Sequence, residues 1–292
     1  MKNIFDTLES IDENLTAAQK ARIVERLSGV INYTPKIGVF GKTGVGKSSL
    51  CNALFGSDIC KVSDVEACTR EPQEVLLGVG QGKGITLLDV PGVGESQDRD
   101  EEYSALYQKL LPELDAILWI LKGDDRAYSV DIEFYTGVVK PHLEAGKPFL
   151  LVINQVDKIE PFREWNVQDR VPGSTQAANI EAKIADVSQS FQMKRSSVIP
   201  VSADEKYGLT KLVDELIFSL PDEKKLAFAR EVEKDNLSSE AKKEVKQSFE
   251  RVVKNVVRGA VAGAAVGGKI AGPVGAAIGG VIGGVGAFFK LW

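Results

Sequence analysis

The chain has 292 residues, of which 43% are hydrophobic and 26% are charged. That length can bury a full core, and the composition excludes intrinsic disorder for the chain as a whole. The 41 acidic and 36 basic residues give a net charge of −5, which argues against a dedicated nucleic-acid-binding domain. Three cysteines without metal-type spacing and a single histidine, His142, favour neither a disulfide framework nor a histidine-based metal or catalytic site. The N-terminus lacks an apolar secretory signal, so we expect a cytoplasmic protein.

Residues 1–33 predict an N-terminal helical segment with two short amphipathic helices. Thr16 and Gln19 have the spacing of a capping box, which starts the second helix, and we expect that helix to end near Ser28 and Gly29. The segment is expected to pack against the neighbouring domain or a partner helix. The first helix places four apolar residues on one face: Ile4, Leu8, Ile11 and Leu15.

Residues 34–220 consist of short β-rich runs that alternate with helical stretches. This alternation predicts an α/β domain with a mainly parallel, six-stranded sheet between helices. Ligands of such sheets bind at the carboxyl ends of the strands. The expected strands are Lys36–Phe40, Glu74–Val79, Ile85–Asp89, Ala116–Leu121, Phe149–Asn154 and Val198–Val201.

The two C-terminal segments differ sharply in charge. In residues 221–258, 18 of 38 side chains are charged, and the pattern predicts a solvated amphipathic helix or helix pair. In residues 259–292 the only charges are Lys269 and Lys290, and eleven of the 28 glycines lie there. The apolar positions of the charged segment repeat at helical spacing: Ala241, Val245, Phe249, Val252 and Val256.

A glycine-rich loop follows the first expected strand and fits the pattern G-x-x-x-x-G-K-[ST]. Glycines let backbone N–H groups turn inward and cradle phosphate oxygens, and the helix expected over 48–55 adds its N-terminal dipole. Lys47 would reach the β- and γ-phosphates, and Ser48 would bind Mg²⁺. The nucleotide-binding residues expected here are Gly41, Lys42, Thr43, Gly44, Val45, Gly46, Lys47, Ser48 and Ser49.

Three further motifs follow later strands in the order that a guanine-nucleotide site requires. In D-V-P-G, Asp89 would hold Mg²⁺ through water and the Gly92 N–H would touch the γ-phosphate. In N-Q-V-D, the Asp157 carboxylate can accept hydrogen bonds from guanine N1–H and N2–H₂, a donor pair that adenine lacks. A backbone N–H after the last strand could meet guanine O6. The residues expected to recognise the base are Asn154, Asp157, Ser202 and Ala203.

With these motifs, residues 34–220 resemble the Era-like group of translation-factor-related P-loop GTPases. GKTGVGKSSLCNALFG, ACTRE, LLDVPGVGES and KGDDRAYSVD are similar to bacterial, often prophage-encoded, members. The resemblance implies that Thr69 is the switch I threonine, which binds Mg²⁺ and the γ-phosphate. Residues 58–70 would be switch I and residues 92–100 switch II, both ordered by the γ-phosphate. It implies hydrolysis that depends on Lys47, Thr69 and Gly92, with a water held by backbone groups of both switches.

The sequence departs from the family pattern at three positions. Gln155 replaces the usual lysine of N-K-x-D, which predicts a lower affinity for the nucleotide. Val93 stands where Ras-like proteins place the glutamine that orients water, so intrinsic hydrolysis should be slow unless another group supplies that interaction. A partner copy of the domain is one source, with Arg126 or Arg70 as candidate groups, although ordinary surface arginines are the favoured interpretation of both. Gly44 replaces the potassium-binding asparagine of some members, which puts potassium activation in doubt.

The glycine-rich tail has glycines spaced by four, as in helix pairs whose backbones approach closely in membranes. Residues 270–289 carry 20 uncharged side chains, about one bilayer span. Seven glycines and a proline make that run only weakly apolar. The tail resembles glycine-zipper segments of membrane-active bacterial proteins, and we expect it to contact the inner membrane. A glycine-packed hairpin in solution and a flexible tail are the alternatives.

The sequence as a whole therefore predicts a Mg²⁺-dependent switch that binds GTP or GDP and hydrolyses GTP, and that couples this to membrane association or self-assembly. The first alternative is a nucleotide-binding interaction or membrane-active module with negligible turnover. The second is a ribosome- or RNA-associated GTPase by family analogy, although no dedicated nucleic-acid-binding domain is visible after residue 220.

Overall fold

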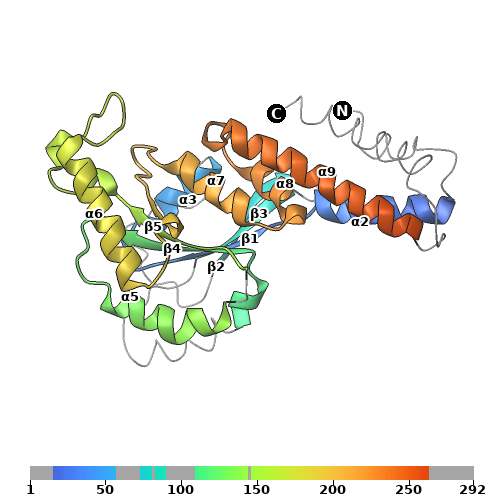
Figure 1. Ribbon diagram of the computed structural model, residues 1–292, viewed down its shortest axis with the longest axis horizontal. Helices are drawn as coiled ribbons and strands as arrows, with labels where there is room; N and C mark the ends of the chain where they lie inside the picture. The colour runs from blue at the N-terminus through green and yellow to red at the C-terminus, as the bar shows by residue number, and fades with distance from the viewer. Residues whose placement is uncertain (1–15, 57–72, 81–82, 90–108, 144–145, 263–292) are drawn as a thin grey trace.

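The computed structural model describes residues 16–56, 73–80, 83–89, 109–143 and 146–262, and in it helices cover both faces of a central sheet (Figure 1). The strands lie in the order β2-β3-β1-β4-β5-β6; β2 is antiparallel to β3, and the other neighbours are parallel. The predicted α/β fold with a mainly parallel sheet is confirmed. The strand bounds are β1 (Lys36–Phe40), β2 (Gln73–Gly80), β3 (Lys83–Asp89), β4 (Ala116–Lys122), β5 (Phe149–Asn154) and β6 (Val198–Pro200).

Alternation along the strands divides the core in two, because successive side chains of a strand point to opposite faces. On β4, Leu118 and Ile120 join one cluster, whereas Trp119 and Leu121 join the other. The first cluster lies under α2 (Ala17–Ile31), α3 (Lys47–Phe55), α7 (Leu209–Ser219), α8 (Asp222–Glu231) and α9 (Ser239–Ala262). The second lies under α5 (Ser129–Phe134) and α6 (Ser174–Ser190). Strands buried on both faces are typical of such layered sheets.

Helix α2 begins at the predicted capping box. Gln19 N–H donates to Thr16 Oγ1 at 3.3 Å, and Thr16 N–H donates back to Gln19 Oε1 at 2.9 Å. The helix continues past Gly29 to Ile31, so the predicted end was too early. Val30 and Ile31 pack against the first core cluster, and this contact outweighs the low helix propensity of the glycine. The first predicted helix lies outside the described residues.

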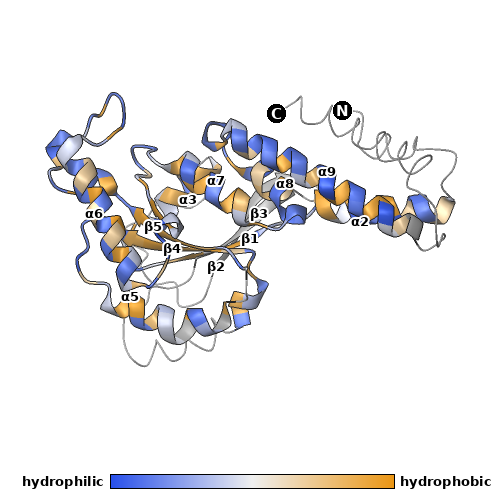
Figure 2. Ribbon diagram, viewed as in Figure 1, coloured by the Kyte–Doolittle hydropathy of each residue, from blue (hydrophilic) through white to orange (hydrophobic). Residues whose placement is uncertain are grey.

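Residues 221–258 form two helices, but the expectation of a largely solvated pair is wrong for α8. Leu226, Ala227 and Phe228 of α8 are each at most 1% exposed, because the helix sits between the sheet and α9. Helix α9 follows the predicted pattern: Ala241, Val245, Phe249 and Val252 are buried, and polar residues occupy its outer face (Figure 2). In the part of the chain that the structure describes, no helix is long and apolar enough to cross a membrane.

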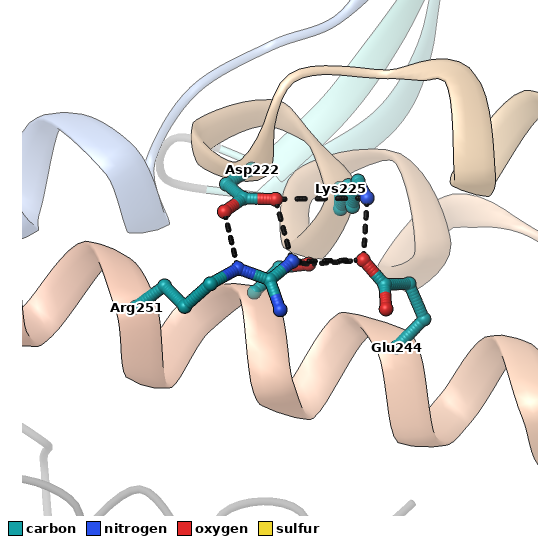
Figure 3. A network of polar contacts seen from close by, with 5 residues as sticks. Asp222, Lys225, Glu244 and Arg251 are labelled. Carbon is teal, nitrogen blue, oxygen red and sulfur yellow. Dashed lines mark hydrogen bonds and ion pairs between the residues drawn. The ribbon is translucent and has the colours of Figure 1, made fainter.

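An ionic network joins α8 to α9 (Figure 3). The Arg251 guanidinium donates to both carboxylate oxygens of Asp222, at 2.6 and 2.8 Å, and to Glu244 Oε1 at 2.9 Å. Lys225, with only 6% of its side chain exposed, donates to Glu244 Oε1 at 2.6 Å and lies 3.6 Å from Asp222 Oδ1. These hydrogen bonds favour the charged carboxylates: the bond from Lys225 lowers the pKa of Glu244, and the bond from Arg251 lowers the pKa of Asp222.

The turn between α8 and α9 also caps the C-terminal end of α3. The Glu233 N–H donates to Leu54 O at 2.9 Å, and Asn236 Nδ2 donates to Ala53 O at 2.8 Å. The last carbonyls of a helix have no partner within the helix, so these bonds satisfy groups that would otherwise be orphaned. Helix α3, which begins at the glycine-rich loop, is thereby held at its C-terminal end by the turn between α8 and α9.

Candidate nucleotide-binding site

The candidate site lies at the carboxyl ends of the strands, where parallel neighbours bring their following loops together. The glycine-rich loop follows β1, the N-Q-V-D segment follows β5, and the residues after β6 complete the group. Asp89 ends β3, in register with Val39 of the neighbouring β1. Thr69 and Gly92, with both predicted switch segments, lie outside the described residues.

The loop between β1 and α3 depends on glycine at two positions. Gly41 has φ of +139° and its Cα approaches Ile120, so a Cβ there would lie 2.4 Å from the Ile120 carbonyl oxygen. Gly46 has φ of +87°, and a Cβ there would lie 2.5 Å from Asn154 Nδ2. Side chains other than hydrogen are therefore excluded by both conformation and space. Gly46 caps the N-terminus of α3, and Thr43 and Gly44 are exposed at the tip of the loop.

Lys47 is the first residue of α3 and its side chain turns back over the loop. Its Nζ donates to Gly41 O at 2.9 Å and to Lys42 O at 3.3 Å. The ammonium group thus lies inside the curve of the loop, at the N-terminus of α3, where an anion would be stabilised by the lysine charge and by the helix dipole. Ser48 and Ser49 follow in the first turn of α3, partly exposed.

Asn154 connects the glycine-rich loop to the loop after β6. Its side chain is 1% exposed; Nδ2 donates to Val45 O at 2.9 Å, and Oδ1 accepts the Ala203 N–H at 3.2 Å. All of its close partners are backbone groups, so the asparagine positions the loops. The Ala203 N–H, predicted to face guanine O6, is in this structure directed at Asn154. Ser202 is fully buried, and its Oγ accepts the Glu205 N–H at 3.2 Å.

Gln155, the departure from N-K-x-D, contacts the glycine-rich loop. It has φ of +60°, and its Nε2 donates to Gly44 O at 3.3 Å. Its Oε1 accepts a hydrogen bond from Lys158 Nζ at 3.3 Å. Only the tertiary arrangement reveals this contact, because the sequence does not tell which loop lies beside residue 155.

Asp157 lies in a short 3-10 turn, Val156–Lys158, shortly after β5 ends at Asn154. Its Oδ1 is buried and has no hydrogen-bond partner among the residues that the structure describes. Buried carboxylate oxygens are costly without donors, and the described part of the chain donates no hydrogen bond to this atom. The donor pair of guanine, N1–H and N2–H₂, has the chemistry that this acceptor lacks.

A buried anchor for the glycine-rich loop was not predicted from the sequence. Lys42 Nζ lies 2.8 Å from Asp131 Oδ2 and donates to Ala127 O at 3.2 Å. Asp131 is 1% exposed, and its Oδ1 accepts from Trp119 Nε1 at 3.2 Å. The loop is thereby tied to the segment after β4. The sequence shows only that Asp131 lies in the first turn of a short helix, and this position does not by itself indicate burial.

The same segment after β4 borders a cavity of about 440 Å³ beside α6. Lys183 of α6 donates to the carbonyl of Asp125 and lies 4.6 Å from the centre of the Tyr128 ring, and burial lowers the pKa of its amine. Arg126, one of the two arginines considered for catalysis in a partner copy, is exposed at this cavity. Arg70 lies outside the described residues.

The oxygen donors of the site fit Mg²⁺, which prefers hard oxygen ligands and keeps several waters. Ser48 is the second residue of α3, the helix after β1, and Asp89 ends the adjacent strand β3, so both follow neighbouring strands. Within the described ranges, no group of three or more acidic, histidine or cysteine side chains forms a metal site by itself. Ser48 and Asp89 are thus the residues of the described part that would hold a magnesium ion, with nucleotide phosphates and waters as the further oxygen ligands.

Comparison with known proteins agrees with this geometry. The family model described as "50S ribosome-binding GTPase" matches residues 36–155. The chain is 46% identical over 206 residues to the uncharacterized protein YkfA of Escherichia coli K12, covering 69% of this chain and 68% of YkfA. It is 42% identical over 227 residues to the uncharacterized protein YfjP of the same strain, covering 76% of each.

Among solved structures, Aquifex aeolicus Era bound to GDP and AlF₄⁻ is similar, with 26% identity and a TM-score of 0.48 over 64% of this chain and 57% of that one. The fold and the loop at the end of β1 define a P-loop nucleotide-binding protein. With the family match and these relatives, the chain belongs to the P-loop GTPases, in one family with YkfA and YfjP.

Proposed function

We propose that this protein is a Mg²⁺-dependent GTPase that works as a molecular switch. The observation that carries the proposal is the buried Asp157 Oδ1, to which no described residue donates a hydrogen bond, at the same sheet edge as the glycine-rich loop. In the proposed mechanism Lys47 and the loop amides neutralise the β,γ-phosphates, and Asp157 selects guanine. Asn154 and Gln155 support the loops, and Ser202 and Ala203 border the base.

The remaining roles follow from the family resemblance and the neighbouring strand ends. Ser48, Thr69 and Asp89 would hold Mg²⁺, which lowers the charge on the phosphates when bound. Gly92 would contact the γ-phosphate, and backbone groups of both switches would orient the attacking water. With Val93 in place of a water-orienting glutamine, we expect slow turnover unless a partner copy, through Arg126 or Arg70, supplies the missing group.

The proposed switch acts through the C-terminal tail. Residues 259–292 would contact the inner membrane or another copy of the chain, in a manner that depends on whether GTP or GDP is bound. The weakly apolar composition of that segment and its glycine spacing support the proposal.

The test is multiple-turnover phosphate release at micromolar protein, with Lys47→Ala as the variant and Lys211→Ala, at an exposed position on α7, as the matched control. We expect Lys47→Ala to abolish phosphate release, because it removes the positive charge inside the loop, and Lys211→Ala to leave the rate unchanged. Equal rates for wild type and Lys47→Ala would contradict the enzymatic part. Tight guanine-nucleotide binding without turnover would instead favour a nucleotide-binding interaction module.

A further inference from the structure

Helices α2 and α9 lie side by side at one end of the molecule, beyond the sheet (Figure 1), and both carry basic residues there. We call these residues the basic end, which we define as Arg22 and Arg26 of α2 with Lys254 and Arg258 of α9. All four side chains are exposed. The two helices are in close contact there. A Cβ added to Gly259 of α9 would lie 3.7 Å from Arg26 Nη1 of α2.

Apolar packing holds these helices together beneath the basic side chains. Ile23 and Leu27 of α2 and Val253 and Val257 of α9 are at most 3% exposed and belong to one core cluster. The residues of the basic end therefore project from two helices that pack against each other and against the core of the domain.

The charges of the basic end are not neutralised within the described residues. None of its four side chains forms an ion pair there, whereas Arg251, one turn earlier in α9, pairs with both Asp222 and Glu244. Within α2 the one carboxylate is Glu25, and no acidic side chain follows Glu250 in the sequence. Residues 251–292 contain five basic and no acidic residues, although the whole chain carries −5.

We propose that the basic end docks on the anionic headgroups of a lipid surface. The chain beyond α9 continues into the weakly apolar run of residues 270–289, and a weak hydrophobic signal anchors a protein stably only when a second signal, such as a basic patch, adds to it. Lysine and arginine near an anionic leaflet supply that signal. The inference rests on the proposed membrane association, but it is independent of GTP hydrolysis.

Nucleic acid is the other polyanion that a basic surface can bind. Single-stranded nucleic acid is held by base stacking on exposed aromatic side chains as well as by charge. Helix α2 contains no aromatic residue, and the one aromatic side chain of α9, Phe249, is 1% exposed. The basic end thus has the positive charge that binds anionic lipid headgroups, but α2 and α9 expose no aromatic side chain on which the bases of an RNA could stack.

The experiment measures binding of the full chain to vesicles of phosphatidylcholine alone and of phosphatidylcholine mixed with phosphatidylglycerol. The variant carries Arg22→Glu, Arg26→Glu, Lys254→Glu and Arg258→Glu. The matched control carries the same change in net charge at four exposed positions elsewhere: Lys109→Glu, Arg163→Glu, Lys194→Glu and Lys211→Glu. Thermal unfolding followed by circular dichroism checks that both proteins fold.

We expect wild type to bind the mixed vesicles more tightly than phosphatidylcholine, and high salt to weaken that binding. The basic-end variant should lose on the order of 100-fold in affinity for mixed vesicles, and the control should keep most of it. Equal loss in both variants, or equal binding of wild type to both kinds of vesicle, would overturn the proposal. If the basic-end variant loses binding to a labelled RNA but binds vesicles as wild type does, the surface belongs to nucleic acid, and this result would also overturn the proposal.

The same preparations separate this proposal from the proposed function. Normal phosphate release by the basic-end variant, together with lost vesicle binding, supports the docking surface and leaves the GTPase intact. Absence of phosphate release from wild type, with vesicle binding that still depends on the basic end, contradicts the GTPase alone. Failure of wild type to bind either kind of vesicle contradicts both the docking surface and the membrane association through the tail.

Discussion

Two polar regions of the molecule differ in how their charges are satisfied. In the network between α8 and α9, each carboxylate has cationic partners: Asp222 meets Arg251 and Lys225, and Glu244 meets both as well. At the carboxyl edge of the sheet, Asp157 Oδ1 is buried and accepts no hydrogen bond from the described residues, and Lys47 donates to carbonyl groups of the loop.

The partners of the charged groups distinguish a structural ionic network from a candidate binding site. A closed set of ion pairs needs no ligand, and its contribution is to hold helices in place. A buried acceptor to which no described residue donates, beside the glycine-rich loop, has hydrogen-bonding capacity left over for the donors of a ligand. The comparison therefore predicts that changes in the network alter stability, whereas changes at the sheet edge alter nucleotide binding.

The largest effect is expected from Asp157→Asn. An amide nitrogen in place of the carboxylate oxygen would face the donor groups of guanine, so affinity for GDP should fall by about 10³-fold. Xanthosine diphosphate, which has a carbonyl in place of the 2-amino group, should lose much less or bind better. Calorimetric titration with both nucleotides measures this, with Glu223→Gln on α8 as an exposed control. A uniform loss for both nucleotides would refute base selection by Asp157.

Glu244→Ala should destabilise the fold by about 3 kcal/mol, because it leaves the buried Lys225 with Asp222 as its remaining partner. Urea unfolding measures the free energy, and GDP affinity measured on the folded protein should stay within a few-fold of wild type. Glu250→Ala, a carboxylate of the same helix outside the network, is the control. A large loss of GDP affinity in Glu244→Ala without loss of stability would break the comparison.

Asn154→Ala should affect both properties, since this residue links two loops through backbone groups. It removes the buried bonds to Val45 O and from the Ala203 N–H, and we expect a loss of about 2 kcal/mol in unfolding free energy. GDP affinity should fall in parallel, because the glycine-rich loop loses its support. Urea unfolding with and without GDP separates the two effects; unchanged stability would mean that the loops hold their positions without Asn154.

The smallest expected effect is the acid sensitivity of the α8–α9 network. The pKa values of Asp222 and Glu244 are lowered in the folded state, so their stabilisation is complete above the unfolded pKa of about 4 and is lost as pH falls through the folded values. Urea midpoints measured across this acid range should fall more steeply for wild type than for Glu244→Gln. Equal slopes would show that the ion pairs do not contribute to acid denaturation.

Much of the domain was determined by the sequence. Strand positions followed from short apolar runs, and the sheet edge that carries the site followed from the motifs after β1, β3 and β5. The capping box of α2 is a local interaction over three residues, so it was predicted correctly from spacing. The burial of α8 was not predicted from the sequence. Its many charged residues are typical of a solvated helix, and only the packing of α9 against it buries its apolar side chains.

Only the tertiary structure decided how distant residues meet. The Lys42–Asp131–Trp119 anchor, the contact of Gln155 with Gly44 and the cap on α3 from Asn236 each join residues far apart in the chain. A single sequence contains no signal for such pairs. The physical reason is that motifs and periodicity report local backbone geometry, whereas a buried polar contact depends on which elements the packed core brings together.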